Sequence, residues 1–375
     1  MKKILIVSFY DLNSEDTNGV TKIGFNLLNY KMSKVDTLRI SYSPPNRIIS
    51  LIKYIVRGKG VFNDYLYRSQ LIENIKLIED YSENYDIVHL LGPQFLYLNG
   101  LLSDNVLKKI VLQPIDNLLI FKGRLIEKVN LARKIFYTIE VYKLKALYRE
   151  LNGFKKIIFV SMRDSRLFNR ISNLKSISIE NGVNLKFNRK SDFEIKETDN
   201  VKLIFHGDLT YAPNIEAVYF LQALSEKLGR DFRIDIIGKY SEKLKLDCDG
   251  VNFIGFVDDL SNYLTSYDLY LCPIFSGAGI KNKFLEASYM RIPMISTREA
   301  AVGTSLKFGI DYEQAESLSD FISCIKRLSN DKPLREFLAE NASLKVEQSF
   351  SWCQVIERYE KEYNEVYFNN NTSVG

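Results

Sequence analysis

The feature that most constrains the fold is an alternation of short apolar segments with longer segments of helical periodicity, present in both halves of the chain. Short, continuously apolar strands separated by helices form parallel sheets that are covered on both faces. Two such sets predict an α/β protein with two doubly wound, Rossmann-like domains. The expected strands are 3–9, 36–42, 86–91, 109–113, 156–160 and 176–179, followed by 202–206, 232–237, 251–254, 268–272, 293–296 and 306–309.

Helical periodicity fills the intervals between these strands. A polar segment without periodicity, 184–200, separates the two sets and predicts domains at 1–185 and 186–349. Residues 350–375 form a final helix and tail, and that helix either caps the second domain or crosses back onto the first. The expected helices are 18–31, 64–80, 124–150 and 162–170, followed by 213–228, 258–265, 281–290, 314–328, 331–345 and 350–368.

Cysteine and histidine usage limits the chemistry. The four cysteines form no CxxC pair, which fits a reducing cytoplasm and argues against a disulfide framework or a zinc site. The two histidines, His89 and His206, both follow apolar runs, so we expect no metal centre built on histidine. No apolar run approaches the roughly 20 residues that span a bilayer. The N-terminal "MKKILIVSFYD" is expected to be a first strand rather than a signal peptide.

Charge is distributed unevenly along the chain. Residues 1–190 contain 31 Lys+Arg and 17 Asp+Glu, a balance of +14, whereas the remainder contains 51 − 31 = 20 and 46 − 17 = 29, a balance of −9. The densest basic stretch, 121–150, is expected to form one long helix. It is either a solvated helix face or a contact with anionic membrane lipid or a lipid-phosphate acceptor. No nucleic-acid motif accompanies the basic residues, so nucleic acid is not an expected partner.

The stretch "PIFSGAGIKNKFLEASYMRIP", 273–293, predicts a strand end, a glycine turn and a helix start. Lys281 and Lys283 stand where the partial positive charge of a helix terminus should repel them. A bound diphosphate would reverse that repulsion, because helix-terminal N–H groups and lysines both attract anions. Glu286 would then accept hydrogen bonds from ribose hydroxyls. The alternative is an ordinary loop with its lysines in solvent.

Two other motifs are weaker. "GAGIKN" has the first two glycines of a dinucleotide fingerprint, but Asn282 replaces the third and the motif follows a late strand, so an NAD-linked dehydrogenase is disfavoured. "DCD", 247–249, matches an Asp-x-Asp pattern that binds metal in some sugar-transfer enzymes. Its position in a polar turn favours a solvated turn, and we assign no metal.

Several segments in order resemble retaining GT-B glycosyltransferases similar to glycosyltransferase family 4. The strongest is "GAGIKNKFLEASYMRIPMIST", and the resemblance spans nearly the whole chain. The other segments are "NGVTKIGFNLL", "FVSMRDSRLF" at 159–168, "IENGVN" at 179–184, "FHGDLTYAPNIEAVYFL" at 205–221, "NFIGFVDDL" at 252–260 and "FSWCQVIERY" at 350–359.

The resemblance implies two domains facing across a cleft, with the last helix, from Ser351, crossing back to the first domain. It implies that Glu286 binds the donor ribose, that Lys281 and Lys283 compensate the diphosphate, and that main chain near Val257 receives the base. Lys283 and Asp116 are the implied catalytic residues, and the alternative role for Asp116 is that of a turn-forming or helix-capping residue. The implied donor-binding residues are Gly19, Gly207, Val257, Gly277, Gly279, Ile280, Lys281, Asn282, Lys283 and Glu286.

The sequence also departs from the family pattern. Ser276 stands near the place of a first glutamate, and the segment "HGDLTYAPN" lacks the usual Arg–Lys pair. Many members have a histidine after the strand at 109–113, where this chain has "VLQPIDNLL" and Asp116 is the nearest polar candidate. These departures concentrate phosphate neutralisation on Lys281 and Lys283.

The function implied is a glycosyltransferase that moves a sugar from a nucleotide-diphosphate donor, UDP or GDP, to a glycan or lipid-linked acceptor. Retention without a metal or cofactor is expected, in bacterial surface polysaccharide or lipopolysaccharide synthesis. The expected location is the cytoplasm or the inner face of the membrane. The alternatives are a sugar-nucleotide epimerase or hydrolase of the same fold and a non-catalytic binding module derived from it.

Overall fold

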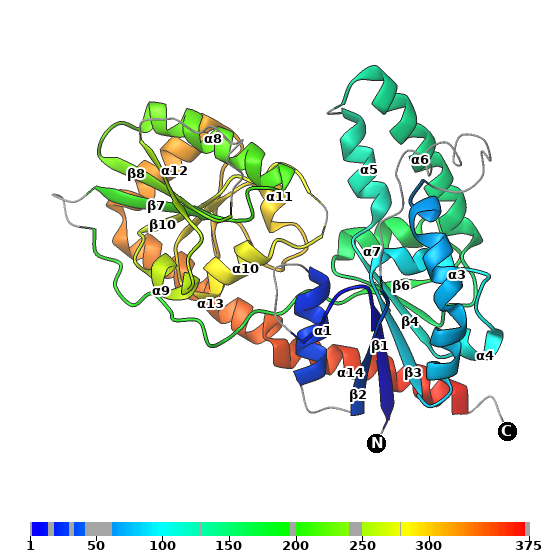
Figure 1. Ribbon diagram of the computed structural model, residues 1–375. Helices are drawn as coiled ribbons and strands as arrows, with labels where there is room; N and C mark the ends of the chain where they lie inside the picture. The colour runs from blue at the N-terminus through cyan, green and yellow to red at the C-terminus, as the bar shows by residue number, and fades with distance from the viewer. Residues whose placement is uncertain are drawn as a thin grey trace. The chain divides into compact units, whose positions relative to one another are not determined.

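The computed structural model describes residues 2–13, 19–29, 34–41, 62–127, 129–195, 200–239, 250–277 and 279–371. The chain divides into two compact units, coloured along the sequence in Figure 1. Unit 1 comprises Met1–Asn181 and Val355–Gly375, and unit 2 comprises Gly182–Gln354. Each unit contains one six-stranded parallel sheet flanked by helices, which confirms the predicted pair of doubly wound α/β domains.

The sheet of unit 1 has the strand order β2-β1-β3-β4-β5-β6. Both faces of its central strands are buried, since Val88 and Leu90 of β3 belong to the main apolar core while His89 between them is also fully buried. This explains the continuously apolar strand sequences. The strands are β1 (Lys3–Ser8), β2 (Lys34–Arg39), β3 (Ile87–Leu91), β4 (Ile110–Ile115), β5 (Lys156–Phe159) and β6 (Ser176–Ser178).

Helices of unit 1 follow the expected alternation with one correction. The single helix expected over 121–150 is wrong: two helices, α5 and α6, pack side by side there (Figure 1). The second begins after Asn130, whose side chain accepts a hydrogen bond from the N–H of Arg133 and so caps a new helix. The helices are α1 (Gly19–Asn29), α3 (Phe62–Ser82), η1 (Pro93–Leu98), α4 (Asp104–Leu107), α5 (Leu118–Glu127), α6 (Leu131–Glu150) and α7 (Met162–Asn169).

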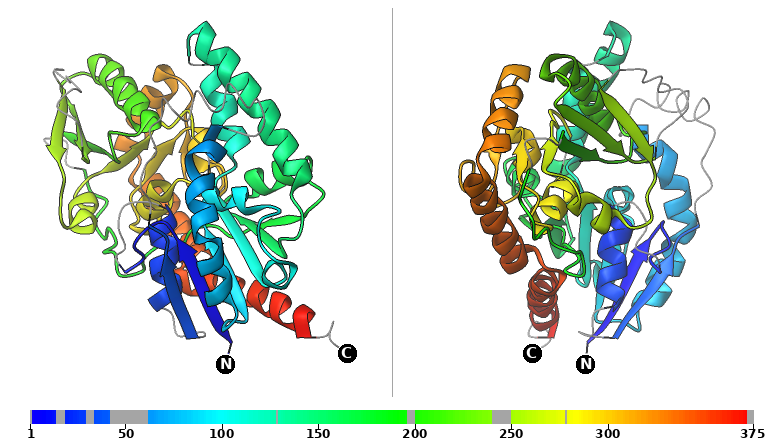
Figure 2. Two further views of the ribbon diagram at one scale, coloured as in Figure 1. Left: turned by 45° about the vertical axis from the view of Figure 1, so that its right-hand side comes forward. Right: turned by 90° about the vertical axis from the view of Figure 1, so that its left-hand side faces the viewer.

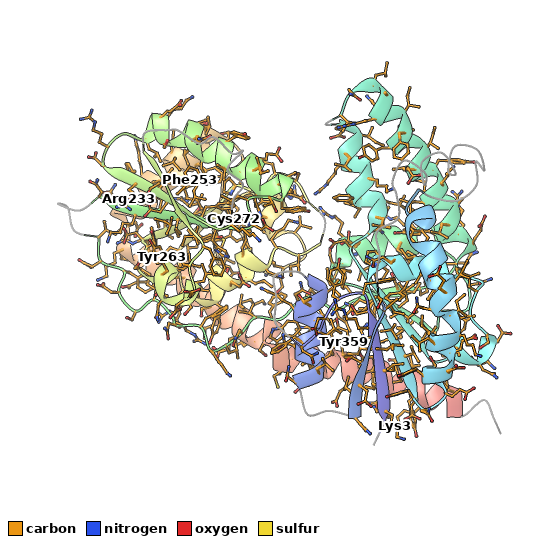
Figure 3. All side chains as sticks on the ribbon, in the orientation of Figure 1. Lys3, Arg233, Phe253, Tyr263, Cys272 and Tyr359 are labelled. Carbon is orange, nitrogen blue, oxygen red and sulfur yellow. The ribbon has the colours of Figure 1, made fainter. Side chains whose placement is uncertain are left out.

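The last helix, α14 (Trp352–Asn371), joins unit 1 from Val355 onward, which confirms that the C-terminal helix crosses back. Its tyrosines contact strands β3 and β4 of the sheet. The hydroxyl of Tyr363 lies 2.7 Å from Nδ1 of His89 on β3, and the hydroxyl of Tyr359 (labelled in Figure 3) accepts from Gln113 on β4 at 2.8 Å. Burial lowers the pKa of His89 to about 4, so this histidine is a neutral core residue.

The sheet of unit 2 has the order β12-β11-β10-β7-β8-β9. Helices α8 and α12 contact each other on one face, while α10 and α13 contact each other on the other face (Figures 1 and 2). The strands are β7 (Val201–His206), β8 (Phe232–Ile237), β9 (Val251–Gly255), β10 (Leu269–Cys272), β11 (Met294–Ser296) and β12 (Glu313–Gln314). The helices are α8 (Ala212–Leu228), α9 (Leu260–Thr265), α10 (Asn282–Tyr289), α11 (Arg298–Ala301), α12 (Leu318–Asn330) and α13 (Lys332–Phe350).

One predicted strand of unit 2 is wrong. Residues 306–309 enter a turn instead, and the sixth strand of the sheet comes later, at β12. Within the turn, the N–H of Lys307 donates to the carboxylate of Asp311 at 2.6 Å and the N–H of Asp311 donates to the carbonyl of Lys307 at 2.9 Å. Gly309 has φ = 75°, a conformation that breaks an extended strand. The "DCD" segment, 247–249, lies outside the described residues.

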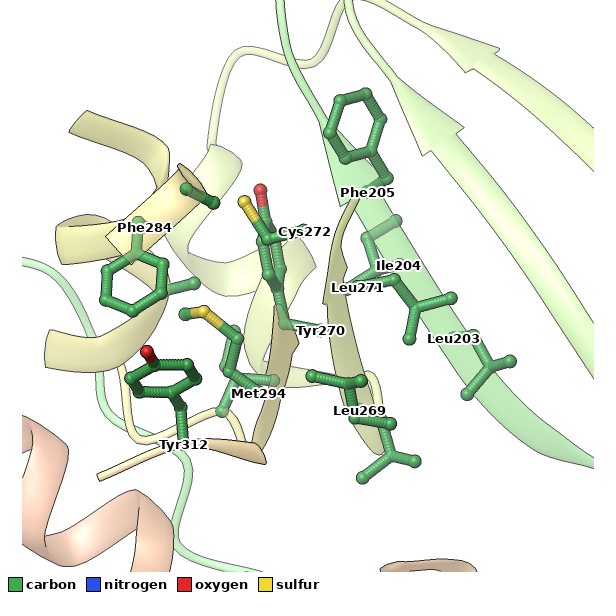
Figure 4. Close-up of a cluster of buried hydrophobic side chains, with 14 of the residues drawn as sticks. Leu203, Ile204, Phe205, Leu269, Tyr270, Leu271, Cys272, Phe284, Met294 and Tyr312 are labelled. Atoms are coloured by element: carbon green, nitrogen blue, oxygen red, sulfur yellow. The ribbon is translucent and has the colours of Figure 1, made fainter. Parts of the chain in front are cut away.

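Aromatic and aliphatic side chains hold α10 against the sheet of unit 2 (Figure 4). Phe284 of α10 is fully buried, and its ring centroid lies 5.3 Å from that of Tyr312 in an edge-to-face arrangement. Tyr270 and Cys272 of β10 are fully buried in the same core. Because Phe284 is anchored, the neighbouring polar residues of α10 have fixed positions relative to the strand ends.

Candidate functional site

The strand order of unit 2 identifies where a ligand should bind. The order reverses between β7 and β10, so the connections after these neighbouring strands leave toward opposite faces of the sheet. In open parallel sheets, ligands occupy the crevice at the carboxyl ends of the strands at such a switch point. The loops there are 207–211 and 273–281, and the second contains four of the ten predicted donor-site residues.

The loop between β10 and α10 depends on its glycines. Gly277 has φ = 124° and Gly279 has φ = 66°, conformations that side-chain-bearing residues rarely adopt. A Cβ atom on Gly277 would also lie 3.3 Å from Cε of Lys281. Ile280 is buried in the core and ties the loop down, and Asn282 is the first residue of α10. The loop therefore brings main chain close to the helix start.

The two lysines of the motif take different positions. Lys281 directly precedes α10, and its ammonium donates to the carbonyl of Gly279 at 3.0 Å. The ammonium of Lys283 donates to Oδ1 of Asn214 on α8 at 2.5 Å and lies 4.4 Å from the ring centroid of Phe205. Among the described residues, Lys283 forms no ion pair with a carboxylate. Its positive charge is therefore available to an anion.

Burial lowers the pKa of Lys283 from 10.5 to about 8, an effect that the charge of Lys281 adds to and that the carboxylate of Glu286 opposes. A lysine with this pKa is still largely protonated at neutral pH. An anion bound beside it would raise its pKa again. The site is therefore poorly neutralised without a ligand and better neutralised with an anionic one.

Gly207 and Gly238 allow the close approach of β7, β8 and Lys283. A Cβ atom on Gly207 would lie 2.4 Å from Nζ of Lys283. Gly238 has φ = 150°, and a Cβ atom there would lie 1.8 Å from the carbonyl oxygen of Gly207. A side chain at Gly238 would have to displace main chain, whereas a side chain at Gly207 would displace the ammonium of Lys283. The structure thus places the predicted Gly207 directly against Lys283.

Glu286 is 9% exposed in the second turn of α10, and its carboxylate meets a histidine that the sequence analysis did not assign to the site. Oε2 of Glu286 lies 3.4 Å from Nε2 of His206, whose Nδ1 lies 3.0 Å from the hydroxyl of Tyr270. This chain of polar contacts orients the carboxylate. His206 ends β7 at the switch point, a position that could have identified it from the predicted strand alone.

A second carboxylate approaches the loop from α8. The hydroxyl of Ser276 donates to Oε2 of Glu216 at 2.8 Å. The sequence analysis found Ser276 where similar proteins often have a glutamate and left that role unfilled. The structure supplies a carboxylate next to this position from a residue 60 positions earlier in the chain.

Val257 lies after β9, and β8 separates β9 from β7 in the sheet. Its side chain is partly buried and packs against the core of unit 2, while the adjacent Phe256 is 75% exposed. No described contact joins Val257 to Lys283 or Glu286 directly. A ligand that reached all three would have to extend along several strand ends, as a nucleotide can.

The remaining predicted residues, Gly19 and Asp116, belong to unit 1. Gly19 begins α1, and a Cβ atom there would lie 3.6 Å from Cγ2 of Ile115. Ile115 has φ = 70°, a rare conformation for a β-branched residue, and Asp116 follows it half-buried. The helix-capping role open to Asp116 is filled by Asn117, whose Oδ1 accepts from the N–H of Leu119 at 3.0 Å.

Metal sites, membrane-spanning helices and disulfides were also sought in the part of the chain that the structure describes. There, no three or more His, Cys, Asp or Glu residues gather as metal ligands would. None of the helices among these residues is long and apolar enough to cross a membrane. Cys272, Cys324 and Cys353 are free thiols.

Residues 200–331 match the family model described as Glycosyl transferases group 1. A curated relative, an uncharacterized 44.6 kDa protein in the cps region of Klebsiella pneumoniae, is 25% identical over 301 residues, 72% of each chain. The segment matched by the family model, 200–331, lies in unit 2 and contains both loops of the switch point.

Solved structures show the same fold over nearly the whole chain. HepE from Anabaena, solved with UDP and glucose, has a TM-score of 0.66 at 12% identity, covering 97% of this chain and 100% of that one. Sucrose-phosphate synthase from Thermosynechococcus elongatus has a TM-score of 0.65 at 15% identity, covering 98% and 100%. WaaG, a glycosyltransferase involved in lipopolysaccharide biosynthesis, has a TM-score of 0.62 at 13% identity, covering 97% and 99%.

The fold is therefore that of the GT-B glycosyltransferases, as predicted. The match of residues 200–331 to the group 1 glycosyl transferase model confirms the prediction of a glycosyltransferase. Membership of family 4 and retention of configuration stay predictions.

Proposed function

We propose that this protein transfers a sugar from a nucleoside diphosphate donor, bound in unit 2, to a glycan or a lipid-linked acceptor. The observation that carries the proposal is the cluster at the start of α10. It joins the ammonium of Lys283, which has no carboxylate partner among the described residues, to helix-terminal main chain and an oriented carboxylate, Glu286. A diphosphate fits the first two features, and a ribose with its two hydroxyls fits the third.

The chemistry follows from the charge that develops in the reaction. As the glycosidic C–O bond breaks, negative charge grows on the diphosphate and positive charge on the sugar ring. Lys283, Lys281 and the N–H groups at the start of α10 are fixed in advance around the diphosphate, so they stabilise the leaving group without reorganising. Asp116 of unit 1 is the residue we propose to act near the donor sugar.

We propose that the configuration of the sugar is retained and that neither a metal nor a cofactor is needed. In the front-face mechanism usually proposed for similar enzymes, the leaving phosphate oxygen accepts the proton of the acceptor hydroxyl. No strong side-chain base is then required. Lysines take the charge-neutralising role that a divalent metal would otherwise have.

Uridine is the first base to test, because HepE was solved with UDP and with UDP-glucose. The curated relative encoded in a cps region and the similarity to WaaG support a role in bacterial surface polysaccharide or lipopolysaccharide synthesis. The free cysteines support a reducing compartment, and we propose the cytoplasm, at the inner face of the membrane.

Calorimetry with UDP, GDP, ADP and CDP tests the donor site, and turnover of the matching sugar nucleotide with and without an acceptor extract tests the reaction. We expect one nucleotide to bind clearly better than the others and turnover to require acceptor. Rapid turnover of donor alone would instead indicate a hydrolase or epimerase. Absence of binding to every nucleotide would indicate a non-catalytic module and overturn the proposal.

A further inference from the structure

One face of α6 exposes a stripe of large apolar side chains. Leu131, Ile135, Ile139 and Tyr142 are 74%, 56%, 45% and 73% exposed. Their spacing of four, four and three residues places them within an arc of about 80° on a helix that turns 100° per residue. We call these four residues the α6 stripe. A stripe of this size is unusual on the surface of a water-soluble unit and indicates a partner.

The rest of α6 is firmly anchored. On the opposite side, Glu140, Leu144 and Tyr148 are fully buried, and Glu140 forms an ion pair of 2.5 Å with Lys122 of α5. The ring centroid of Tyr148 lies 5.1 Å from that of Phe168 on α7. The α6 stripe is therefore presented by a rigid helix and does not contribute to the core of unit 1.

Positive charge borders the α6 stripe. At 100° per residue, three exposed basic residues lie along its edge: Lys134, Lys145 and Arg149. The carboxylates of α6 are the buried Glu140 and Glu150 at the C-terminal end. The exposed face is thus apolar along its centre and cationic along its border for most of its length.

We propose that the α6 stripe docks on an anionic lipid surface. An apolar stripe with lysines and arginine at its edge inserts side chains among acyl chains while its cations contact lipid phosphates. Tyr142 suits the boundary, because its ring is apolar and its hydroxyl can remain hydrated. A second copy of this chain is a poorer partner, since two such faces would bring like charges together. The observations on α6 are sufficient for the docking proposal. That docking would also bring the protein to a lipid-linked acceptor rests on the proposed function.

A second exposed helix face provides a matched control. On α13 of unit 2, Phe337 and Leu344 are 51% and 42% exposed and lie seven residues apart on one face. Their neighbours on that helix include Glu336 and Glu340. This face is apolar but bordered by acidic residues, so it should not bind an anionic surface.

The test is co-sedimentation of the full chain with vesicles of phosphatidylcholine alone or mixed with phosphatidylglycerol. We expect the wild type to partition onto the anionic vesicles. The variant Ile135→Gln/Ile139→Gln should lose about tenfold in partition, because it removes two exposed apolar side chains that would insert partway among the acyl chains. The variant Lys134→Gln/Lys145→Gln should lose about thirtyfold in partition onto anionic vesicles only, because each cation removed weakens partition about fivefold. The control Phe337→Gln/Leu344→Gln should bind like the wild type.

Equal partition of the stripe variant and the wild type would overturn the proposal. So would a fall in melting temperature or a change in oligomeric state in the stripe variant, because either would mean that another segment or a second copy covers the α6 stripe. Nucleotide binding by the stripe variant should be unchanged. Loss of vesicle binding with normal nucleotide binding supports the docking face independently of the donor site, and failure of the donor site leaves the vesicle result intact.

Discussion

The carboxyl ends of the two sheets have different chemical character. In unit 2, the loops after β7 and β10 bring together Lys283, Asn214, Glu286 and His206, two of them formally charged. In unit 1, the loops after β1, β4 and β6 bring Gly19 within van der Waals range of the aliphatic Ile115 and near the amide of Asn181. The same architecture therefore places Lys283 and Glu286 at the strand ends of unit 2, whereas the atoms nearest to Gly19 at the strand ends of unit 1 belong to an aliphatic side chain and an amide.

The largest effect we predict is on folding, at the close contact beneath the unit 2 site. Gly238→Ala puts a Cβ atom 1.8 Å from the carbonyl oxygen of Gly207, at a residue with φ = 150°. We expect a loss of about 3 kcal/mol or more in the free energy of unfolding, because backbone atoms have to move. Scanning calorimetry measures this loss. A melting temperature within a degree of the wild type would show that the loops of unit 2 are not packed this tightly.

A matched pair of glycine substitutions compares the two units directly. Gly207→Ala places a methyl group where Nζ of Lys283 lies, and that flexible side chain can move away without unfolding the protein. We expect nucleotide affinity to fall about tenfold with little loss of stability, since one charged contact is weakened. Gly19→Ala meets atoms only at 3.6 Å or beyond and should leave affinity almost unchanged. Titration calorimetry measures the nucleotide affinity of both variants. Equal losses of affinity in Gly207→Ala and Gly19→Ala would contradict the proposed difference between the units.

The charge of Lys283 predicts a pH dependence. With a pKa of about 8, the ammonium loses its proton as the pH rises from 7 to 9, whereas a bound diphosphate is already ionised there. Nucleotide affinity should therefore fall above pH 8, approaching tenfold per pH unit. Because the folded pKa lies below 10.5, the unfolding free energy should rise between about pH 8 and 10.5. The variant Lys283→Gln should show neither change, and an identical pH profile in that variant would assign the effect to another group.

The smallest effect we predict concerns His206, which positions Glu286 through a 3.4 Å contact. His206→Gln should weaken nucleotide binding about threefold, because the carboxylate keeps its position on α10 and loses one neighbour. Binding of inorganic pyrophosphate should not change, since Glu286 is proposed to contact the ribose. Calorimetry with both ligands checks this split, and an equal loss for both would place His206 near the phosphates instead.

Much of the fold could be predicted because the strands of both sheets are buried on two faces and therefore apolar throughout. The errors have local causes. Asn130 caps a new helix inside a stretch that looked continuously helical, and Gly309 with Asp311 forms a turn inside an apolar segment.

The candidate site was only partly predictable. Its glycines and charges lie within one loop and the start of one helix, so spacing in the sequence was sufficient to select Lys283 and Glu286. The partners Asn214, His206 and Glu216 come from β7 and α8, all more than 60 residues before Lys283 and Glu286, and only the strand order brings them there. The capping role of Asn117 likewise required the main-chain geometry after β4.

The central claim is that unit 2 binds the diphosphate and ribose of a sugar nucleotide through Lys283 and Glu286, while Asp116 of unit 1 serves only the transfer step. The most direct test is titration calorimetry of the selected nucleoside diphosphate against Lys283→Ala, Glu286→Ala and Asp116→Asn. We predict that each of the first two loses about a hundredfold in affinity, as expected when a charged hydrogen-bonding partner is removed, and that Asp116→Asn binds like the wild type but transfers sugar slowly. Wild-type affinity in both Lys283→Ala and Glu286→Ala would contradict the account.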